Sequence, residues 1–139
     1  MATALVVLDQ IFKSLVEKNI ALGESIVIIP KILSLTLTHN TGMAFGMLSG
    51  QAVTLSMWIA VIVTGLVIYY YDEVTGILSK ISLALILGGT IGNFIDRAKS
   101  GYVIDYLNLH VWPIFNLADI ALTAGVVLLV IGFWKREEK

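Results

Sequence analysis

The chain has 139 residues, of which 58% are hydrophobic and only 14% are charged. Its length predicts one domain over residues 1–139. Because a soluble domain carries about 25% charged residues, we expect lipid to be the solvent for much of the surface. With a net charge of -1, nothing in the composition suggests a nucleic-acid partner, which would need a basic face. The absence of cysteine excludes disulfides, thiolate metal sites and a cysteine nucleophile.

Four stretches predict membrane-spanning helices, because about 20 apolar residues cross a hydrocarbon core of about 30 Å. The first stretch is short and contains Asp9 and Lys13, whereas the second has no charged side chain. The third ends in polar residues, and the fourth is interrupted by Asp119. Their approximate bounds are residues 2–20, 52–71, 77–95 and 113–134.

Between the first two spans the pattern changes to that of a strand. Leu33, Leu35 and Leu37 alternate with polar residues, which is typical of a half-buried strand. A β-branched run precedes them and a turn sequence follows at 40–42. An open sheet edge cannot face hydrocarbon. The chain is therefore predicted to be a mainly α membrane protein, with four transmembrane helices and a small β-sheet cradle at the membrane surface over residues 25–48.

The unusual polar residues of the chain gather on one side of the membrane. With four spans, the connections after the first and third lie opposite both termini, so one site can collect side chains from both. The residues that map there are Asp9, Lys13, Asn40, Asn93, Asp96, Arg97, Asp105, Asn116 and Asp119. Lysine and arginine are divided evenly enough that the charge bias does not decide which side is cytoplasmic.

Two of these acids suggest chemistry. If Trp134 marks one interface, the helix rise places Asp119 roughly 8 Å inside the other edge of the hydrocarbon core, a depth at which charges usually mark function. Asp105 lies in the preceding loop. Two carboxylates brought together share one proton, so that the ionised one can activate water and the protonated one can polarise a peptide carbonyl.

Ordinary structural interpretations remain open for the polar residues near these acids. Asn116 and Asp119 have the spacing of a capping box. Asn93, Asp96 and Arg97 share one helix face and fit either a polar helix end or a scaffold of donors. We expect Asp96 to pair with Arg97 or another basic group, without a catalytic role.

Asp9 and Lys13, at i and i+4, have the spacing of an ion pair within the first helix. We expect a structural role for both. The two histidines, His39 and His110, are far apart and neither lies in an H-E-x-x-H helix, so no zinc site is predicted.

Five fragments together resemble the bacterial lipoprotein signal peptidase (type II signal peptidase) family, over nearly the whole chain. Each fragment is weak alone, but their order, the four spans and the strand segment make the resemblance specific. The fragments are L-D-Q-I-F-K at 8–13, H-N-T-G-M-A-F-G at 39–46, G-N-F-I-D-R at 92–97, V-I-D-Y at 103–106 and F-N-L-A-D at 115–119.

The resemblance implies that Asp105 and Asp119 are the catalytic pair of an intramembrane aspartic endopeptidase without metal or cofactor. It implies removal of the signal peptide from prolipoproteins, just before a cysteine carrying diacylglycerol. It also implies a monomer in the bacterial inner membrane, in contact with membrane lipid, with the site near the outer face and both termini cytoplasmic. The residues that match the family's supporting positions are Asn40, Asn93, Arg97 and Asn116, with Asp9, Lys13 and Asp96 as structural polar residues.

The alternative is a non-enzymatic membrane subunit that handles protons or ions, since buried acids also serve relays. A presenilin-like enzyme is not favoured: Tyr71-Asp72 supplies its Y-D motif, but no G-x-G-D follows. A rhomboid-type enzyme lacks G-x-S-G around Ser49. Within the resembled family, Phe12 replaces a small hydroxyl residue and Tyr106 replaces the usual phenylalanine.

Overall fold

The computed structural model describes residues 1–41, 52–71, 74 and 76–137. Within these residues the chain forms four helices and three strands, mainly helical as predicted. In chain order they are α1 (Ala2–Asn19), β1 (Ser25–Ile29), β2 (Leu33–Asn40), α2 (Ala52–Tyr70), α3 (Ile77–Ser100), β3 (Val103–Asn108) and α4 (Leu117–Glu137).

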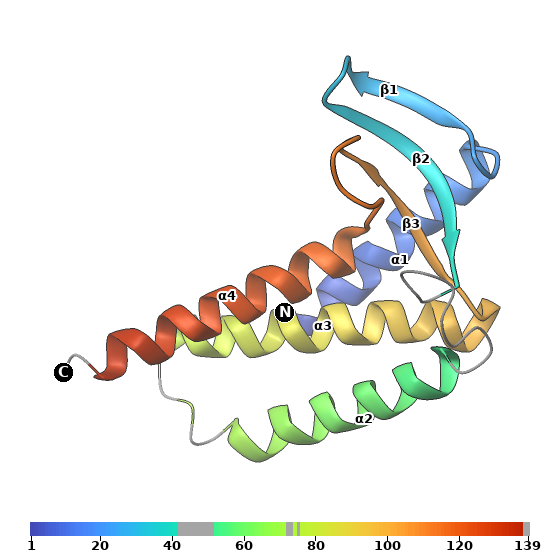
Figure 1. Ribbon diagram of the computed structural model, residues 1–139. Helices are drawn as coiled ribbons and strands as arrows, with labels where there is room; N and C mark the ends of the chain where they lie inside the picture. Colours follow the sequence, from blue (N-terminus) through green and yellow to red (C-terminus); the bar gives the residue numbers. More distant parts are fainter. Residues whose placement is uncertain (42–51, 72–73, 75, 138–139) are drawn as a thin grey trace.

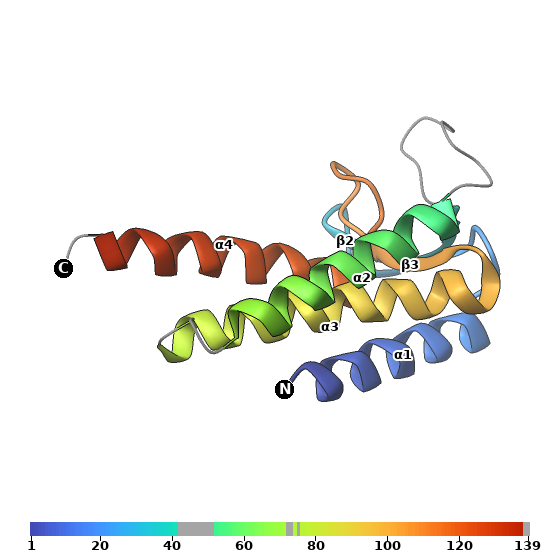
Figure 2. The same ribbon diagram turned by 90° about the horizontal axis from the view of Figure 1, so that it is seen from below.

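Helix α3 is the centre of the bundle, because it packs against each of the other helices. Figure 1 shows α4 alongside α3, with α2 on the other side of it, and Figure 2 shows α1 following the second half of α3. The sheet projects from the end of the bundle where α1 and α3 finish. Side chains from α1, α3 and β3 can therefore meet near the start of α4.

The outer faces of the helices are apolar and exposed. Trp58 and Ile68 on α2, and Val130 and Trp134 on α4, each expose more than half of their surface. By length and composition, one helix of the described part, α3, could cross a membrane, and shorter apolar stretches occupy 58–70 and 117–132. Continuous apolar surface of this kind is unusual for a soluble monomer.

The sheet is antiparallel in the order β1-β2-β3. The predicted pair β1 and β2 is present, and residues 42–48 of the predicted cradle lie outside the described residues. The prediction was wrong about 103–106, which was read as a loop but forms strand β3 against β2. The register places Thr38 opposite Asp105 and Asn40 opposite Val103, so the third strand carries one of the two acids into the sheet.

Beneath the sheet, a small apolar core joins it to the bundle. Val16 and Ile20 from α1 pack with Leu37 from β2 and with Ile104 and Tyr106 from β3. This burial fixes the position of β3 over the end of α1.

Two helices differ in extent from the sequence expectation. Helix α3 continues to Ser100, beyond the expected 95, and ends at Gly101, whose left-handed φ of 79° suits a residue without Cβ. Helix α4 begins at Leu117, later than the expected 113, because the preceding segment pairs with β3. The polar residues of α3 therefore lie inside a helix rather than at its end.

Candidate active site

Asp105 and Asp119 are brought together by a short backbone pairing. The N–H groups of Tyr106 and Leu107 donate to the Phe115 carbonyl at 3.0 and 2.8 Å, and the Phe115 N–H donates to the Leu107 carbonyl at 3.1 Å. This pairing holds the residues just before α4 against the strand that carries Asp105. Asp105 is almost fully buried on β3, and Asp119 is half-buried in the first turn of α4.

Asn116 connects the two acids. Its Nδ2 donates to Asp105 Oδ1 at 2.7 Å, and its Oδ1 accepts the Asp119 N–H at 2.9 Å. The Asn116 N–H in turn donates to Asp119 Oδ2 at 3.1 Å. The last two bonds are the capping box that the spacing allowed, so Asn116 both caps α4 and bridges the two carboxylates.

Two further asparagines each hold one acid. Asn40 at the end of β2 donates from Nδ2 to Asp105 Oδ2 at 2.8 Å. Asn93 on α3 donates from Nδ2 to Asp119 Oδ1 at 2.7 Å. Each carboxylate thus accepts hydrogen bonds at both of its oxygens from neutral groups.

The surroundings of Asp105 change its ionisation. The pKa of Asp105 is raised to about 6, first by burial and then by the charge of Asp119, while hydrogen bonds from Asn40 and Asn116 act in the opposite direction. A carboxyl whose pKa lies this close to neutrality can hold or release a proton during a reaction cycle.

The structure gives Asp9, Lys13 and Asp96 a common place. Lys13 Nζ lies 2.8 Å from Asp9 Oδ2 and 2.7 Å from Asp96 Oδ2. The expected pair within α1 is present, and the basic partner of Asp96 is Lys13 from α1. All three side chains are buried beside the two acids.

Arg97 lies close enough to Asp105 and Asp119 for their charges to act on its guanidinium. The sequence left open whether it belongs to a polar helix end or donates to other polar groups, and the family resemblance predicted a supporting role. Its Nε is buried and has no hydrogen-bond partner among the described residues. That prediction therefore stays a prediction.

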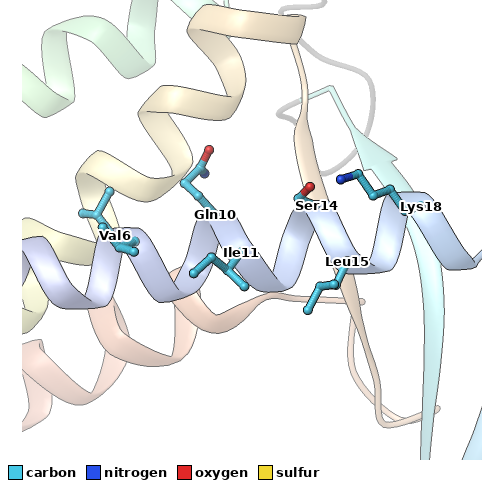
Figure 3. Close-up of a pocket in the computed structure, with 7 residues that line it drawn as sticks. Val6, Gln10, Ile11, Ser14, Leu15 and Lys18 are labelled. Carbon is cyan, nitrogen blue, oxygen red and sulfur yellow. The ribbon is translucent and has the colours of Figure 1, made fainter.

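Gln10 was not predicted as part of the site. Its Nε2 donates to Asp96 Oδ1 at 2.7 Å, and Figure 3 shows its side chain directed from α1 towards α3. Its position in L-D-Q-I-F-K, between Asp9 and Lys13, was the available signal. The other side chains drawn there line a hollow of about 500 Å³ along α1 that does not include Asp105 or Asp119.

An apolar pocket opens beside Asp119. It has a volume of about 530 Å³ and extends along α4. Besides Asp119 its lining offers one hydroxyl, that of Thr123, and is otherwise apolar. The remaining lining residues are Leu109, Trp112, Phe115, Ile120, Ala124 and Val127. Such a pocket can hold an extended apolar segment or an acyl chain next to a carboxylate.

Comparison with known proteins matches the family model described as signal peptidase (SPase) II to residues 1–135. The lipoprotein signal peptidase of Streptococcus pyogenes serotype M5 is 46% identical over 142 residues, covering 96% of this chain and 90% of the relative. That of Halothermothrix orenii is 41% identical over 133 residues, covering 96% and 92%.

Solved structures give the same result for the fold. A bacterial membrane enzyme structure determined at 2.3 Å resolution superposes with a TM-score of 0.89 at 33% sequence identity. The match covers 96% of this chain and 85% of the other. The described helices and the sheet therefore belong to one known arrangement.

Proposed function

This chain belongs to the signal peptidase II family, and we propose that Asp105 and Asp119 are its catalytic pair. The chain is a lipoprotein signal peptidase, an aspartic peptidase that cleaves the signal peptides of prolipoproteins, and a bacterial membrane enzyme. Family membership decides against the proton- or ion-handling subunit. The observation that carries the catalytic assignment is the bridge through Asn116, which touches both carboxylates.

In the proposed reaction the pair begins with one shared proton. The ionised carboxylate takes a proton from water, whose oxygen attacks the scissile carbonyl carbon. The protonated carboxyl hydrogen-bonds to the carbonyl oxygen and gives its proton to that oxygen as negative charge develops there. When the C–N bond breaks, the departing amine takes a proton from the carboxyl that received it from water. One hydroxyl of the tetrahedral intermediate returns its proton to the other carboxylate as the product carbonyl forms, so the pair again holds one proton.

The supporting residues orient the pair. Asn40, Asn93 and Asn116 supply amide hydrogens that fix the direction of each carboxylate. Arg97 supplies positive charge near both acids. We assign Asp9, Lys13 and Asp96 to holding this arrangement in place.

The apolar pocket beside Asp119 supports the finer part of the proposal. We propose that it takes apolar substrate groups flanking the scissile bond, just before the diacylglyceryl-modified cysteine. The sheet would form the surface cradle over the site. The enzyme would act as a monomer that crosses the inner membrane four times, with the site near the outer face and both termini cytoplasmic.

The direct test is cleavage of a diacylglyceryl-modified prolipoprotein peptide by purified protein in detergent. We expect Asp105→Asn and Asp119→Asn each to lower kcat by at least about 1,000-fold. Asp72→Asn, in the connection between α2 and α3, is the matched control and retains activity. Cleavage at the normal rate by either of the first two variants, in folded form, would rule out the pair.

A further inference from the structure

Lys13 uses all of its hydrogen-bonding capacity inside the protein. A lysine ammonium has three N–H donors, and Lys13 Nζ has three acceptors within reach. These are Asp9 Oδ2 at 2.8 Å, Asp96 Oδ2 at 2.7 Å and Asn93 Oδ1 at 3.1 Å. The Lys13 side chain is 1% exposed, so water does not replace any of them.

Both carboxylates that hold Lys13 also hold a backbone N–H group. Asp96 Oδ2 accepts the N–H of Ile104 at 3.2 Å, and Asp9 Oδ1 accepts the N–H of Ala118 at 3.0 Å. Ile104 directly precedes Asp105, and Ala118 directly precedes Asp119. Each carboxylate therefore anchors the backbone one residue before one member of the catalytic pair.

The third contact of Lys13 acts on Asp119 by another route. Asn93 Oδ1 accepts from Lys13 and, at 3.0 Å, from Asn116 Nδ2. With its oxygen engaged in this way, the amide of Asn93 must present its Nδ2 to Asp119, to which it donates at 2.7 Å. Lys13 thereby fixes the orientation of the amide group that aims Asp119.

We propose that Lys13 is a positioning residue for catalysis. Through its contacts with Asp96, Asp9 and Asn93, it fixes the backbone before Asp105, the backbone before Asp119 and the orientation of the Asn93 amide. The inference rests on the proposed function, since it requires Asp105 and Asp119 to be the catalytic pair. Two carboxylates around one ammonium leave a buried net negative charge, which is costly unless every group is well placed. The cluster thus tolerates few other arrangements and transmits a change at Lys13 to both acids.

The decisive variant is Lys13→Arg, because it keeps the positive charge and so separates geometry from charge. A guanidinium carries its donors in a planar fork and cannot direct a single nitrogen at three oxygens. We expect the variant to insert and fold, with kcat lowered by at least about 10-fold and KM within about 2-fold of the parent. Lys13→Met, which also removes the charge, should lower kcat by about 100-fold.

The pH profile of kcat gives a readout that a merely structural role would not move. Two cations act on the pair, Arg97 from α3 and Lys13 from α1, and Lys13 is itself bound to Asp9 and Asp96. Lys13→Arg leaves the sum of these charges unchanged. If the two acids move apart, the coupling between them weakens, so the acid and alkaline limbs of the profile approach each other. Loss of stability alone would lower the profile without narrowing it.

Lys18→Arg and Lys18→Met are the controls, because Lys18 is an exposed lysine on the same helix (Figure 3). Both variants should match the parent in kcat and in the pH profile of kcat. Asp96→Asn repeats the test from α3, and we expect the same fall in kcat, because one amide oxygen cannot serve Lys13, Gln10 and Ile104 together.

A folded Lys13→Arg protein with the parental kcat and pH profile would overturn the inference, since charge alone would then suffice. If Lys13→Arg does not fold, the Asp96→Asn variant decides. A folded Asp96→Asn protein with the parental kcat and the parental pH profile of kcat would likewise overturn the inference. Either result leaves the catalytic pair intact as long as Asp105→Asn and Asp119→Asn are inactive. Activity in those two variants would remove the proposed function itself.

Discussion

The carboxylates of Asp105 and Asp119 are held by asparagine amides rather than by direct ion pairs with described cations. An ammonium or guanidinium bonded to either carboxylate would favour its ionised form strongly. Amide donors favour that form less, and they leave the pair free to share a proton. Lys13 instead forms its ion pairs with Asp9 and Asp96. The absence of a cation bonded directly to either carboxylate, among the described residues, thus suits the acid–base work of the pair.

The ionisation of Asp105 predicts how stability depends on pH. Burial raises the pKa of Asp105 from 3.8 to about 6, so ionisation costs the folded state more than the unfolded one. The stability it contributes is fully present below about pH 4 and is lost as pH rises through about 6, by at most about 3 kcal/mol. Asp105→Asn removes this titration. In thermal unfolding in detergent, the Tm of Asp105→Asn minus that of the parent should therefore increase between pH 4 and pH 8.

The Tm difference between Asp105→Asn and the parent also contains the effect of the lost hydrogen bond to Asn40 or Asn116. This effect does not depend on pH, so it cancels when the Tm differences at pH 4 and pH 8 are compared. Glu24→Gln, at an exposed carboxylate before β1, is the matched control for the loss of one carboxylate. A Tm difference that is the same at both pH values for Asp105→Asn would contradict the raised pKa.

Asn116 has two roles that substitution can separate. Asn116→Ala removes both the cap of α4 and the amide donor to Asp105, and the loss of the cap costs about 1 kcal/mol. Asn116→Ser keeps an oxygen for the Asp119 N–H, but its shorter side chain has no atom at the position from which Nδ2 donates to Asp105. Both variants should lose about 100-fold in kcat, whereas only the alanine variant should show a clearly lower Tm. Parental activity in Asn116→Ser would mean that the bridge to Asp105 is dispensable.

Sequence reasoning located the polar residues better than it located their partners. Topology placed Asn40, Asn93 and Asn116 on one side, and all three now contact Asp105 or Asp119. The partner of Asp96 was left open, because a sequence shows neighbours at i+3 and i+4 but not those on another helix. Lys13 lies 83 positions away from Asp96, and only the packing of α1 on α3 brings them together.

At the level of elements, β3 shows why part of the fold was not predicted. A half-buried strand alternates apolar and polar residues, but Val103, Ile104, Asp105 and Tyr106 are all buried, so both faces are covered and no alternation appears. The strand partner lies more than 60 residues earlier in β2. An acid in such a run looks like a loop residue until its asparagine partners are known.

The junction of α1, α3 and α4 depends on a glycine. A Cβ on Gly92 would lie 2.7 Å from Asp9 Oδ2 and 3.2 Å from the Ala118 Cβ. We expect Gly92→Ala to push Asp9 away from α4, lowering the free energy of unfolding by about 1–3 kcal/mol and reducing kcat. Gly65→Ala on α2, where nothing lies within 4 Å, is the matched control and should be neutral or stabilising in the same thermal unfolding measurement. Equal Tm values for the two variants would contradict this close approach.

Considered as a whole, the molecule has an apolar belt and a polar end. The exposed apolar side chains of α2 and α4 suit lipid, while the buried acids, their asparagines and the sheet gather where α1 and α3 finish. The composition predicted the belt, because 14% charged residues cannot cover a soluble surface. The even division of lysine and arginine gives no orientation, so the direction in which the polar end faces needs an experiment.

Because the chain has no cysteine, single cysteines can report which side of the membrane each end of α3 faces. Val111→Cys lies in the loop after β3, at a position 90% exposed, and Lys80→Cys lies at the start of α3, at an exposed position. If the site faces outwards, a membrane-impermeant maleimide should label Val111→Cys in spheroplasts and Lys80→Cys only after permeabilisation. The opposite pattern would reverse the orientation. Labelling of both in intact spheroplasts would mean that α3 does not separate two compartments, and the depth argued for Asp119 would then fail with it.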